Sequence, residues 1–566
     1  MPQMTQSPSA EDRPIDAAGP AAETALPQSR FRTALEQGEF VVTLEAVPAA
    51  SPSGRGVDTI VKEAEELAAY GLVHAMSLTD NPGGGHAIMP DELAKQIQQT
   101  GLDSIVHFSC KDFTRNGAIS RAYALEHMGL RNILALTGDY PKEGYWGASK
   151  PSFDLDAVTL IELLQDMNEG LVDADPRKGT PAPLCGFYVG ACVSPFKLTE
   201  AEQMTQYYKL QRKMNAGARF VISQLGFDMR KVQELKQYCD LHDITVPLIG
   251  NVYVLMAGVA RTMNRNQIPG AVVPDSLLRY LETFPKGKEG RPMFLEHAAK
   301  MFAVVRGLGY QGVHLGGFGL KVEEAREIIE RAGEFQPAWQ EHLREMVYPM
   351  EPKERQFYFF QTDSATGLNT ATPVDRRKTG NPKGRLQLMY RAMRLLHALV
   401  FQPRTPGFWL AQRACHIADG NRILRGMLHW EEKIAKEITV NCRECGDCAL
   451  PHLAYLCPDS GCPKNLRNGP CGGSYRGMCE VYPDRECIYF RAYNRLKLVG
   501  REEELRDMPV VTRDWSLWRQ PSWITYFLGR DHMKVDIPES WKPKPPEEAP
   551  KEAPKTAEAK GKPPET

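Results

Sequence analysis

The chain has 566 residues, more than one hydrophobic core usually holds, and this length predicts about two to four domains. Hydrophobic residues make up 42% and charged residues 25%, as in ordinary soluble proteins, and the formal net charge is -1. This balance argues against nucleic-acid partners, which usually require a basic surplus. No run reaches ~18 uninterrupted apolar residues, and the start lacks the basic and apolar regions of a secretory signal. We therefore expect a cytoplasmic protein with no membrane partner.

Both ends of the chain are expected to be disordered. Residues 1–33 are rich in Pro, Ala, Ser and acidic side chains, and residues 536–566 form a low-complexity tail of Pro, Lys and Glu. Such compositions bury too little apolar surface to offset the entropy that folding costs. The simplest interpretation of the tail is a solvated extension without a specific role.

Eight short runs rich in β-branched and apolar residues recur in the first 333 residues. They read FVVTLEA (40–46), HAMSLT (74–79), SIVHFSC (104–110), NILALTG (132–138), FYVGACV (187–193), RFVISQ (219–224), VPLIGNVYV (246–254) and GVHLGG (312–317). Segments with helical spacing lie between them. In DTIVKEAEELAAYG, for example, Ile60, Ala64 and Leu67 share one face and Gly71 is a stop signal.

Fully apolar strands that alternate with amphipathic helices predict a parallel sheet covered by helices. Eight such units favour a closed (β/α)8 barrel, a TIM barrel, with an open α/β sheet as the alternative. We assign the barrel to residues 34–335. Residues 336–386 are turn-rich and predict a connector, and residues 387–535 predict a smaller, mostly helical and Cys-rich domain.

Chemistry on such a barrel collects at the carboxyl ends of the strands. Polar residues end or follow five of the predicted strands: Glu45, Thr79, Asp80, His107, Ser109, Asp139 and Gln224. Glu45 is informative because a carboxylate inside a buried strand is costly unless something satisfies it. Its alternative interpretation is a rim carboxylate paired with a Lys or Arg.

Cysteine is concentrated in one stretch, which holds eight of the 13 Cys residues. Three form a CxxCxxC motif and five follow among Gly and Pro: Cys442, Cys445, Cys448, Cys457, Cys462, Cys471, Cys479 and Cys487. A dense group in a long chain favours metal ligation over disulfides. The motif with a more distant fourth Cys fits a [4Fe–4S] cluster, and eight Cys could hold one cluster and one tetrahedral Zn, or two clusters. Structural zinc without a redox role is the alternative.

Three blocks of the predicted barrel resemble the methylenetetrahydrofolate reductase family. VHFSCKDFTRNGAISRAYALEHMGLRNILALTGDYP carries a strand that ends in His and a small polar residue, then a helix, then a strand that ends in a Gly-Asp-x-Pro turn. KLQRKMNAGARFVISQLGFD is similar to the family's Lys/Arg helix, Ala-Gly-Ala turn and strand ending in Gln, and VVTLEAVPA is similar to its first strand. The blocks occur in family order and at family-like separations.

The resemblance implies roles for individual residues. Glu45 takes the place of the family's general acid, and Gln224 that of an amide that touches the folate. Seven residues fall where the family touches FAD: Thr79, His107, Gly138, Asp139, Lys209, Arg212 and Lys213. Simpler interpretations stay open. Asp139 could only stabilise its turn, His107 could be a satisfied barrel histidine, and the helix face of Lys209 and Lys213 could be solvated.

These residue types suit the reduction of 5,10-methylenetetrahydrofolate to 5-methyltetrahydrofolate. Opening the bridging ring requires a proton on one nitrogen, which a carboxylic acid with a raised pKa, such as Glu45, can deliver. Reduced flavin then delivers hydride to the remaining iminium. A fixed carboxylate such as Asp139 can stabilise the developing cation, and Gln224 can both donate to and accept from a pterin edge. The groups suited to the flavin diphosphate or ribityl oxygens are Lys209, Arg212 and Lys213.

The chain departs from the family pattern where the nicotinamide or pterin ring would stack. Thr137 stands where the family has an Arg before Gly-Asp, IGNVYVLMAG replaces a Pro-Gly-Ile-Leu-Pro loop, and Ala191 or Cys192 stands at an aromatic of the fifth strand. Tyr253 or Phe227 could supply a stacking face, or could pack in the core instead. These changes question the electron donor more than the folate chemistry.

Residues 387–530 are similar to the C-terminal domain often found with these reductases, and to the iron–sulfur partner subunit of acetogen reductases. The stretches CGDCALP, AYLCP and CPKNLRNGPCGGS carry this likeness. It implies a cluster that feeds electrons to the flavin, or a surface that docks a partner. The donor would then be NAD(P)H, ferredoxin or a redox partner protein.

We therefore predict an FAD-dependent methylenetetrahydrofolate reductase that acts on a tetrahydrofolate substrate, carries a [4Fe–4S] cluster, Zn or both, and forms an oligomer. One alternative is a folate-dependent methyltransferase on the same barrel, which would purify without flavin. The other is a non-catalytic electron-transfer or assembly module that uses the barrel as a scaffold.

Overall fold

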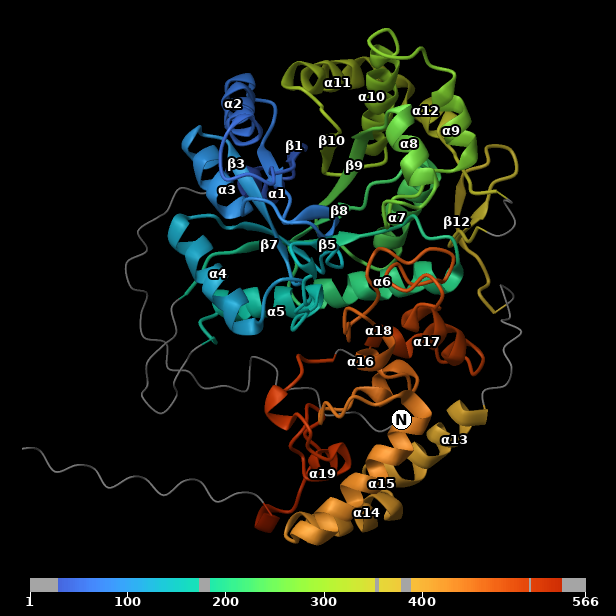
Figure 1. Cartoon of the computed structure of the whole chain (residues 1–566). Coiled ribbons are helices and arrows are strands. Elements are labelled where there is room, and N and C mark those ends of the chain that lie inside the picture. Colours follow the sequence, from blue (N-terminus) through green and yellow to red (C-terminus); the bar gives the residue numbers. More distant parts are fainter. Residues whose placement is uncertain (1–28, 173–183, 352–355, 378–387, 508–509, 542–566) are drawn as a thin grey trace, which may run out of the picture. The chain divides into compact units, whose positions relative to one another are not determined.

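The computed structural model describes residues 29–172, 184–351, 356–377, 388–507 and 510–541 (Figure 1). Most of the two ends expected to be disordered, residues 1–28 and 542–566, lie outside the described residues. Helix α1 (Arg30–Glu36) begins before the expected start of the barrel at residue 34. The Ser29 side chain caps this helix, and Phe31 is fully buried in the barrel core. Ala34 and Leu35 are buried beside it, and these apolar anchors order the segment despite its polar composition.

Eight parallel strands close into a barrel, as the sequence predicted. They are β1 (Val41–Ala46), β2 (Ala75–Leu78), β3 (Asp103–Ser109), β4 (Asn132–Leu136), β7 (Tyr188–Val193), β8 (Phe220–Ser223), β9 (Leu248–Val254) and β10 (Gly312–Gly317). They follow one another round the barrel in chain order, and β10 closes it by pairing with β1, Gly312 lying opposite Val41. Each strand falls on one of the eight apolar runs, because barrel strands are buried on both faces.

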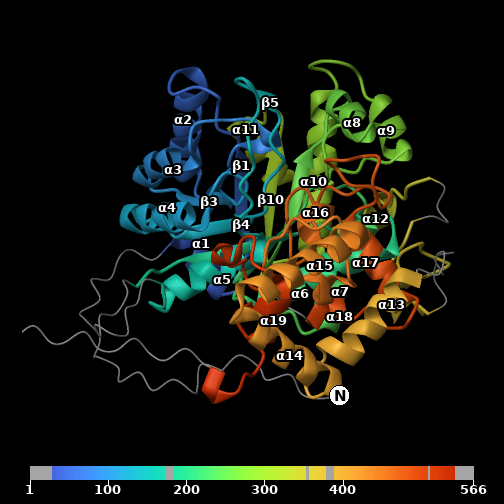
Figure 2. The same ribbon diagram turned by 60° about the horizontal axis from the view of Figure 1, so that its bottom comes forward.

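Helices cover the outside of the barrel (Figures 1 and 2). The long ones are α2 (Arg55–Tyr70), α3 (Pro90–Gln99), α4 (Arg115–Met128), α5 (Ala157–Asn168), α6 (Glu200–Asn215), α7 (Met229–Leu241), α10 (Arg291–Gly307) and α11 (Val322–Phe335). Shorter ones are α8 (Ala257–Asn264), α9 (Asp275–Glu282) and α12 (Trp339–Glu345). Gly71 ends α2 in the left-handed conformation, with φ of 80°, as the predicted stop signal requires.

One end of the barrel interior is packed with apolar side chains. The buried members of this cluster are Phe31, Ala34, Leu35, Val41, Ala75, Ile105, Leu134, Tyr188, Phe220, Ile222 and Ile249. The ring of Phe31 meets the rings of Phe220 and Tyr188 edge-on, with centroids 5.3 Å and 6.4 Å away. Since helix α1 seals this end, the polar strand ends at the opposite, carboxyl end are left to form a site.

The chain divides into two compact units that are interleaved along the sequence. The first spans residues 1–394, 436–443 and 449–513, and the second spans residues 395–435, 444–448 and 514–566. The barrel and most of the Cys-rich stretch therefore belong to the same unit. The consecutive domain boundaries expected from the sequence stay a prediction.

Within the first unit, the Cys-rich segment packs against helix α6. It carries α16 (Pro458–Gly461), α17 (Ile488–Lys497) and α18 (Glu504–Asp507), and α17 and α18 lie beside α6 in both views (Figures 1 and 2). The side chains of α6 are buried almost throughout, because the barrel covers one face and the Cys-rich segment covers another. Lys209 and Lys213 are 3% and 7% exposed, so the interpretation of a solvated lysine face is wrong.

The remaining elements are small or helical. Two hairpins pair β5 (Glu143–Gly144) with β6 (Gly147–Ala148) and β11 (Phe360–Thr362) with β12 (Asn369–Pro373). The C-terminal region is helical and rich in Cys, as expected, and also contains α13 (Leu388–Leu396), α14 (Pro406–Asp419), α15 (Arg422–Val440) and α19 (Ser522–Phe527). In the second unit, Phe408 of α14 packs against Tyr526 and Phe527 of α19. None of the helices in the described ranges is both long enough and apolar enough to cross a membrane.

Candidate functional site

A cavity of about 290 Å³ lies at the carboxyl ends of the barrel strands. It brings together eight of the nine side chains or backbone positions expected at the site: Glu45, Thr79, His107, Gly138, Asp139, Lys209, Lys213 and Gln224. These residues come from strands far apart in the sequence, and the closed barrel places them round one space. Arg212 is the exception, because it lines a separate cavity on the outside of the barrel.

Glu45 projects from β1 into this cavity in a tight apolar setting. Burial raises the pKa of its carboxyl from 4.5 to about 7. A methyl group on Gly316 of β10 would lie 2.9 Å from Glu45 Oε2 and 3.2 Å from the Tyr253 ring. Within the described part of the chain no Lys or Arg forms an ion pair with Glu45, so the paired rim carboxylate is wrong, and a sizeable fraction of the carboxyl keeps its proton at neutral pH.

Two neutral histidines line the cavity next to Glu45. His107 Nε2 lies 2.8 Å from the Ser77 hydroxyl, and His314 Nδ1 lies 2.8 Å from the Thr43 hydroxyl. Burial lowers the pKa of His107 to about 4 and that of His314 to about 3. Both imidazoles therefore stay neutral at physiological pH and can offer one donor and one acceptor each.

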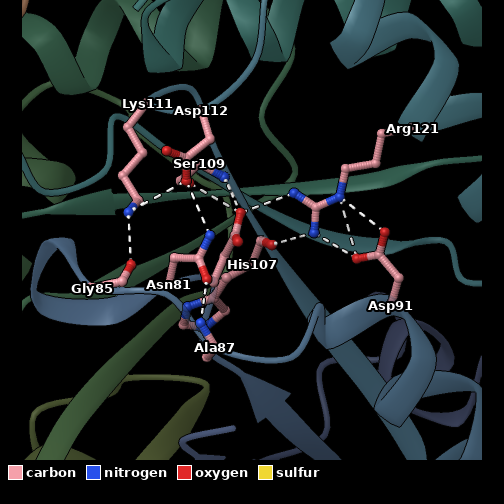
Figure 3. A network of polar contacts seen from close by, with 10 residues as sticks. Asn81, Gly85, Ala87, Asp91, His107, Ser109, Lys111, Asp112 and Arg121 are labelled. Atoms are coloured by element: carbon pink, nitrogen blue, oxygen red, sulfur yellow. Dashed lines mark hydrogen bonds and ion pairs between the residues drawn. The ribbon is translucent and has the colours of Figure 1, made fainter. Parts of the chain in front are cut away.

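A buried ion network fixes the ends of β2 and β3 (Figure 3). Arg121 of α4 donates to Asp80 Oδ2 at 2.9 Å, to Asp91 at 3.0 Å and to the His107 carbonyl at 3.3 Å. The same Asp80 oxygen accepts from the backbone and hydroxyl of Ser109, each at 3.0 Å. Asp80 and Ser109 thus brace the strand ends that carry His107, whereas the sequence had suggested only that they are polar strand ends.

Asp139 follows β4 at the mouth of the cavity. Its Oδ2 accepts a 2.7 Å hydrogen bond from the backbone N–H of Gly83, which ties the β4 turn to the β2 loop. Gly138 has φ of 87°, and a side chain there would press on Ser109 and Lys111 at 3.0–3.1 Å. The carbonyl of Gly138 accepts a 2.9 Å hydrogen bond from Lys464 Nζ of the Cys-rich segment.

Several buried polar atoms face the cavity without a partner among the described residues. They are Thr79 Oγ1, Ser194 Oγ and Asn251 Oδ1. Buried polar atoms are normally satisfied, so several such atoms round one cavity indicate a ligand that is held by hydrogen bonds. Gln224 adds an amide, whose Oε1 accepts from the Leu225 N–H at 3.1 Å and whose Nε2 faces Gly270 and Gly472.

The basic side chains of α6 divide between different partners. Lys213 Nζ donates to the Cys192 carbonyl, and burial lowers its pKa to about 8. Lys209 Nζ donates to the Gly469 and Pro470 carbonyls at 3.3 Å and 3.1 Å, and Arg212 donates to the Arg506 carbonyl at 3.3 Å. Of the three groups expected at a flavin diphosphate, only Lys213 is engaged solely by the barrel itself.

The Cys-rich segment supplies one wall of the cavity. The residues concerned are Lys464, Pro470, Cys471, Gly472, Gly473 and Glu480. Lys464 forms a buried ion pair with Glu480, and the two side chains are 3% and 7% exposed. The barrel cavity is thus closed in part by a segment that follows the last barrel strand by more than 100 residues.

Four thiols gather behind this wall. Cys462, Cys471, Cys479 and Cys487 line a cavity of about 20 Å³, and Lys464, Pro470, Cys471 and Glu480 line both cavities. Burial raises the pKa of Cys462 to about 12 and raises that of Cys471 and Cys487. Backbone N–H groups oppose this by pointing at sulfur: Lys464 and Leu466 at Cys462, Gly473 at Cys471, and Tyr489 and Phe490 at Cys487. Amides aimed at several sulfurs suit thiolates bound to a metal.

The other four Cys residues of the predicted metal set are divided between the units. Cys442 and Cys457 lie in the first unit, Cys445 and Cys448 in the second, and their metal-binding role stays a prediction. In the second unit Asp447, Asp531 and His532 place ligand-type atoms within 4.8 Å of one another. His532 is hydrogen-bonded to Asp447, so a polar brace accounts for this group.

Two family models match the chain. The model described as methylenetetrahydrofolate reductase matches residues 30–333, which is more than half of the chain. The chain belongs to the methylenetetrahydrofolate reductase family. A second model, described as methylene-tetrahydrofolate reductase C terminal, matches residues 424–516. The family assignment thus covers the whole barrel and most of the Cys-rich stretch, in agreement with the resemblance.

Curated members of the family are similar over part of the chain. The 5,10-methylenetetrahydrofolate reductase of Pectobacterium carotovorum subsp. carotovorum is 26% identical over 179 residues, 31% of this chain and 52% of that protein. Methylenetetrahydrofolate reductase (NADH) 1 of Arabidopsis thaliana is 22% identical over 262 residues, 43% of this chain and 42% of that protein. The chain spans about half the length of the curated relatives it matches.

A solved Clostridium thermocellum protein, described as binding two copies of 5-methyl-5,6,7,8-tetrahydrofolic acid, aligns at 12% identity with a TM-score of 0.38, over 55% of this chain and 100% of that chain.

Sequence reasoning missed several residues of the site. They are Ser194, Asn251, His314, Lys464 and Glu480. His314 and Asn251 are polar residues inside apolar strands, as Glu45 is. The same signal could therefore have predicted them from the sequence. Lys464 and Glu480 carry no such signal, because only the packing of the Cys-rich segment on the barrel brings them there.

Proposed function

We propose that this chain is a flavin-dependent reductase that converts 5,10-methylenetetrahydrofolate to 5-methyltetrahydrofolate. The observation that carries the proposal is Glu45, a carboxylic acid with a pKa of about 7 in the cavity that Asp139 and Gln224 also line. Membership of the family supports the substrate class. Because this chain matches only about half the length of the curated relatives, the complete reductase activity is proposed for it.

The cavity suits the reactive end of a flavin. Thr79, Ser194 and Asn251 offer polar atoms without a partner among the described residues, and Lys213 adds a cationic donor to the same cavity. Such atoms can meet the polar edge of an isoalloxazine and its ribityl oxygens. FAD is the form that the family resemblance implies, although Lys209 and Arg212 already donate to carbonyls. When bound, the flavin supplies the reducing equivalents.

The protein's own residues account for proton delivery and orientation. Protonated Glu45 donates to the ring nitrogen that leaves when the methylene bridge opens, and becomes a carboxylate. Gln224 holds the pterin edge, because its amide carries both donors and an acceptor. Asp139 is fixed by the Gly83 N–H and places negative charge where the substrate becomes cationic.

Electron input is assigned to the four thiols behind the cavity wall. Four thiols that line one cavity can hold either a tetrahedral zinc or an iron–sulfur cluster. The wall that this cavity shares with the barrel cavity favours a redox role, and so a cluster. NAD(P)H, ferredoxin or a redox partner protein would then be the donor.

The test is catalysis with a matched pair of carboxylates. We expect purified protein to hold flavin and to form 5-methyltetrahydrofolate from 5,10-methylenetetrahydrofolate with a reduced artificial donor. Glu45→Gln should lower kcat by roughly 10²-fold or more, the usual scale for a general acid. The control is Glu65→Gln, which replaces an exposed carboxylate of α2 and should leave the rate unchanged.

Protein that purifies without flavin and cannot be loaded with it would contradict the reductase and favour the methyltransferase. A Glu45→Gln variant as active as the control variant would contradict the role of the acid and favour a scaffold without catalysis.

A further inference from the structure

The loop around Cys471 is held by the barrel through its carbonyl groups. Lys209 Nζ binds the carbonyls of Gly469 and Pro470, Gln206 binds that of Cys471 at 2.7 Å, and Lys197 Nζ binds those of Gly472 and Ser474, the last at 2.7 Å. Five carbonyls within six residues, 469–474, therefore point toward α6 and the β7–α6 connection. Three side chains that follow β7 thus fix the orientation of a loop far along the chain.

This orientation has an electrostatic consequence. Because the Gly472 carbonyl points to the barrel, the N–H of the same peptide, that of Gly473, points the other way and donates to the Cys471 sulfur. Gly469 makes the approach possible, since it has φ of 128° and a side chain there would lie 2.8 Å from the Lys209 stem. A negative charge on the Cys471 sulfur is stabilised by this arrangement.

The two lysines add a further positive field. Lys197 and Lys209 are 2% and 3% exposed, and in the described ranges neither ammonium is ion-paired with a carboxylate. Asp156 offsets part of the cost of burying Lys209, but a buried cation without a salt bridge stays costly. Lys209 Nζ binds the Pro470 carbonyl and Lys197 Nζ binds the Gly472 carbonyl, so the two ammonium groups hold the peptides on either side of Cys471. An anionic group at Cys471 would compensate both cations.

We propose that Lys197 and Lys209 are positioning residues for a metal group bound at Cys462, Cys471, Cys479 and Cys487, and that they raise its reduction potential. Reduction adds negative charge to a thiolate-bound group, and nearby cations favour that state. This assigns Lys209 to the thiol site rather than to a flavin diphosphate. The inference rests on the metal site within the proposed function.

The experiment is a redox titration of the full-length holoprotein, with iron, acid-labile sulfide and zinc measured on the same sample. In Lys197→Met and Lys209→Met we expect the ratio of reduced to oxidised centre at a fixed ambient potential to fall at least tenfold, which is about 59 mV for a one-electron couple. Lys209→Arg should restore most of the wild-type value. Gln206→Leu keeps both charges, so it should lower metal retention more than it shifts the potential.

Lys497→Met is the control, because it removes a buried lysine that pairs with Glu200 on α6. If both methionine variants keep wild-type iron content and potential, the inference is overturned while the metal site survives. If a methionine variant loses its iron but Lys497→Met does not, the positioning role is supported. Wild-type protein that holds zinc alone, or no metal, overturns the metal site itself, and folate reduction with an artificial donor would still be measurable.

Discussion

At the scale of single residues, the site depends on the placement of one carboxyl group. Glu45 lies on a strand between buried neighbours, and Gly316 and Tyr253 leave it little room. The two histidines that share the cavity have pKa values of about 4 and 3, so neither titrates near neutral pH. Glu45 is therefore the group whose protonation changes in the range where the enzyme is expected to work.

We expect kcat to be constant below pH about 7 and to fall above it, tenfold per pH unit, as Glu45 loses its proton. The sign follows from the role of Glu45, which must be protonated to act as an acid. Lys213, with a pKa of about 8, adds a second decline at higher pH. A pH–rate profile of the wild type and of Glu45→Gln separates the two, because the decline centred near pH 7 should vanish in the variant.

Gly316→Ala perturbs the same group without removing it. A methyl group 2.9 Å from Oε2 should push the carboxyl toward the open cavity, which lowers its pKa and shifts the decline to lower pH. We expect the rate at pH 7 to fall roughly 10- to 100-fold, as for other small misplacements of a catalytic group. Gly333→Ala on α11, where a methyl group meets nothing within 4 Å, is the control. An unshifted profile in Gly316→Ala would contradict the tight placement of Glu45.

At the scale of elements, the barrel holds its site through braces between loops. Arg121 joins Asp80, Asp91 and the His107 carbonyl, and its side chain is 4% exposed. Arg121→Leu would leave Asp80 buried without its counter-charge. We expect the free energy of unfolding of the barrel to fall by about 3–5 kcal/mol, measured by denaturant titration.

The control for this variant is Arg261→Leu, which breaks an exposed pair with Glu282 and should cost about 0–1 kcal/mol. Equal losses in the two variants would show that the network of Figure 3 contributes no more than a surface ion pair.

The sequence predicted the strands of the barrel better than any other feature of the structure. All eight strands were predicted, because barrel strands are apolar on both faces and stand out as short uninterrupted runs. The places of Glu45, His107 and Gln224 in the cavity were predicted because a polar residue at the end of an apolar run is costly unless a ligand or another residue satisfies it. Helix α1 was missed, because it is short and only Phe31, Ala34 and Leu35 of it are buried.

At the scale of the whole molecule, the sequence could not show where the Cys-rich segment lies. Its residues 449–513 belong to the same compact unit as the barrel, and they bring Lys464, Cys471 and Glu480 to the cavity. No periodicity reports a contact between a loop and a helix that lie more than 200 positions apart. The full burial of Lys209 was unpredictable for the same reason, since the residues that cover it come from that segment.

This arrangement makes the barrel cavity and the thiol cavity neighbours with a shared wall. The most direct test of the account is the half-reaction in which folate reoxidises the reduced flavin. The flavin of anaerobic full-length protein is first reduced, and 5,10-methylenetetrahydrofolate is then added. Flavin absorbance and folate products are followed together. We predict that one equivalent of substrate reoxidises the flavin and yields one equivalent of 5-methyltetrahydrofolate, at a rate that Glu45→Gln lowers roughly 10²-fold. Flavin that stays reduced in the presence of substrate would contradict the account.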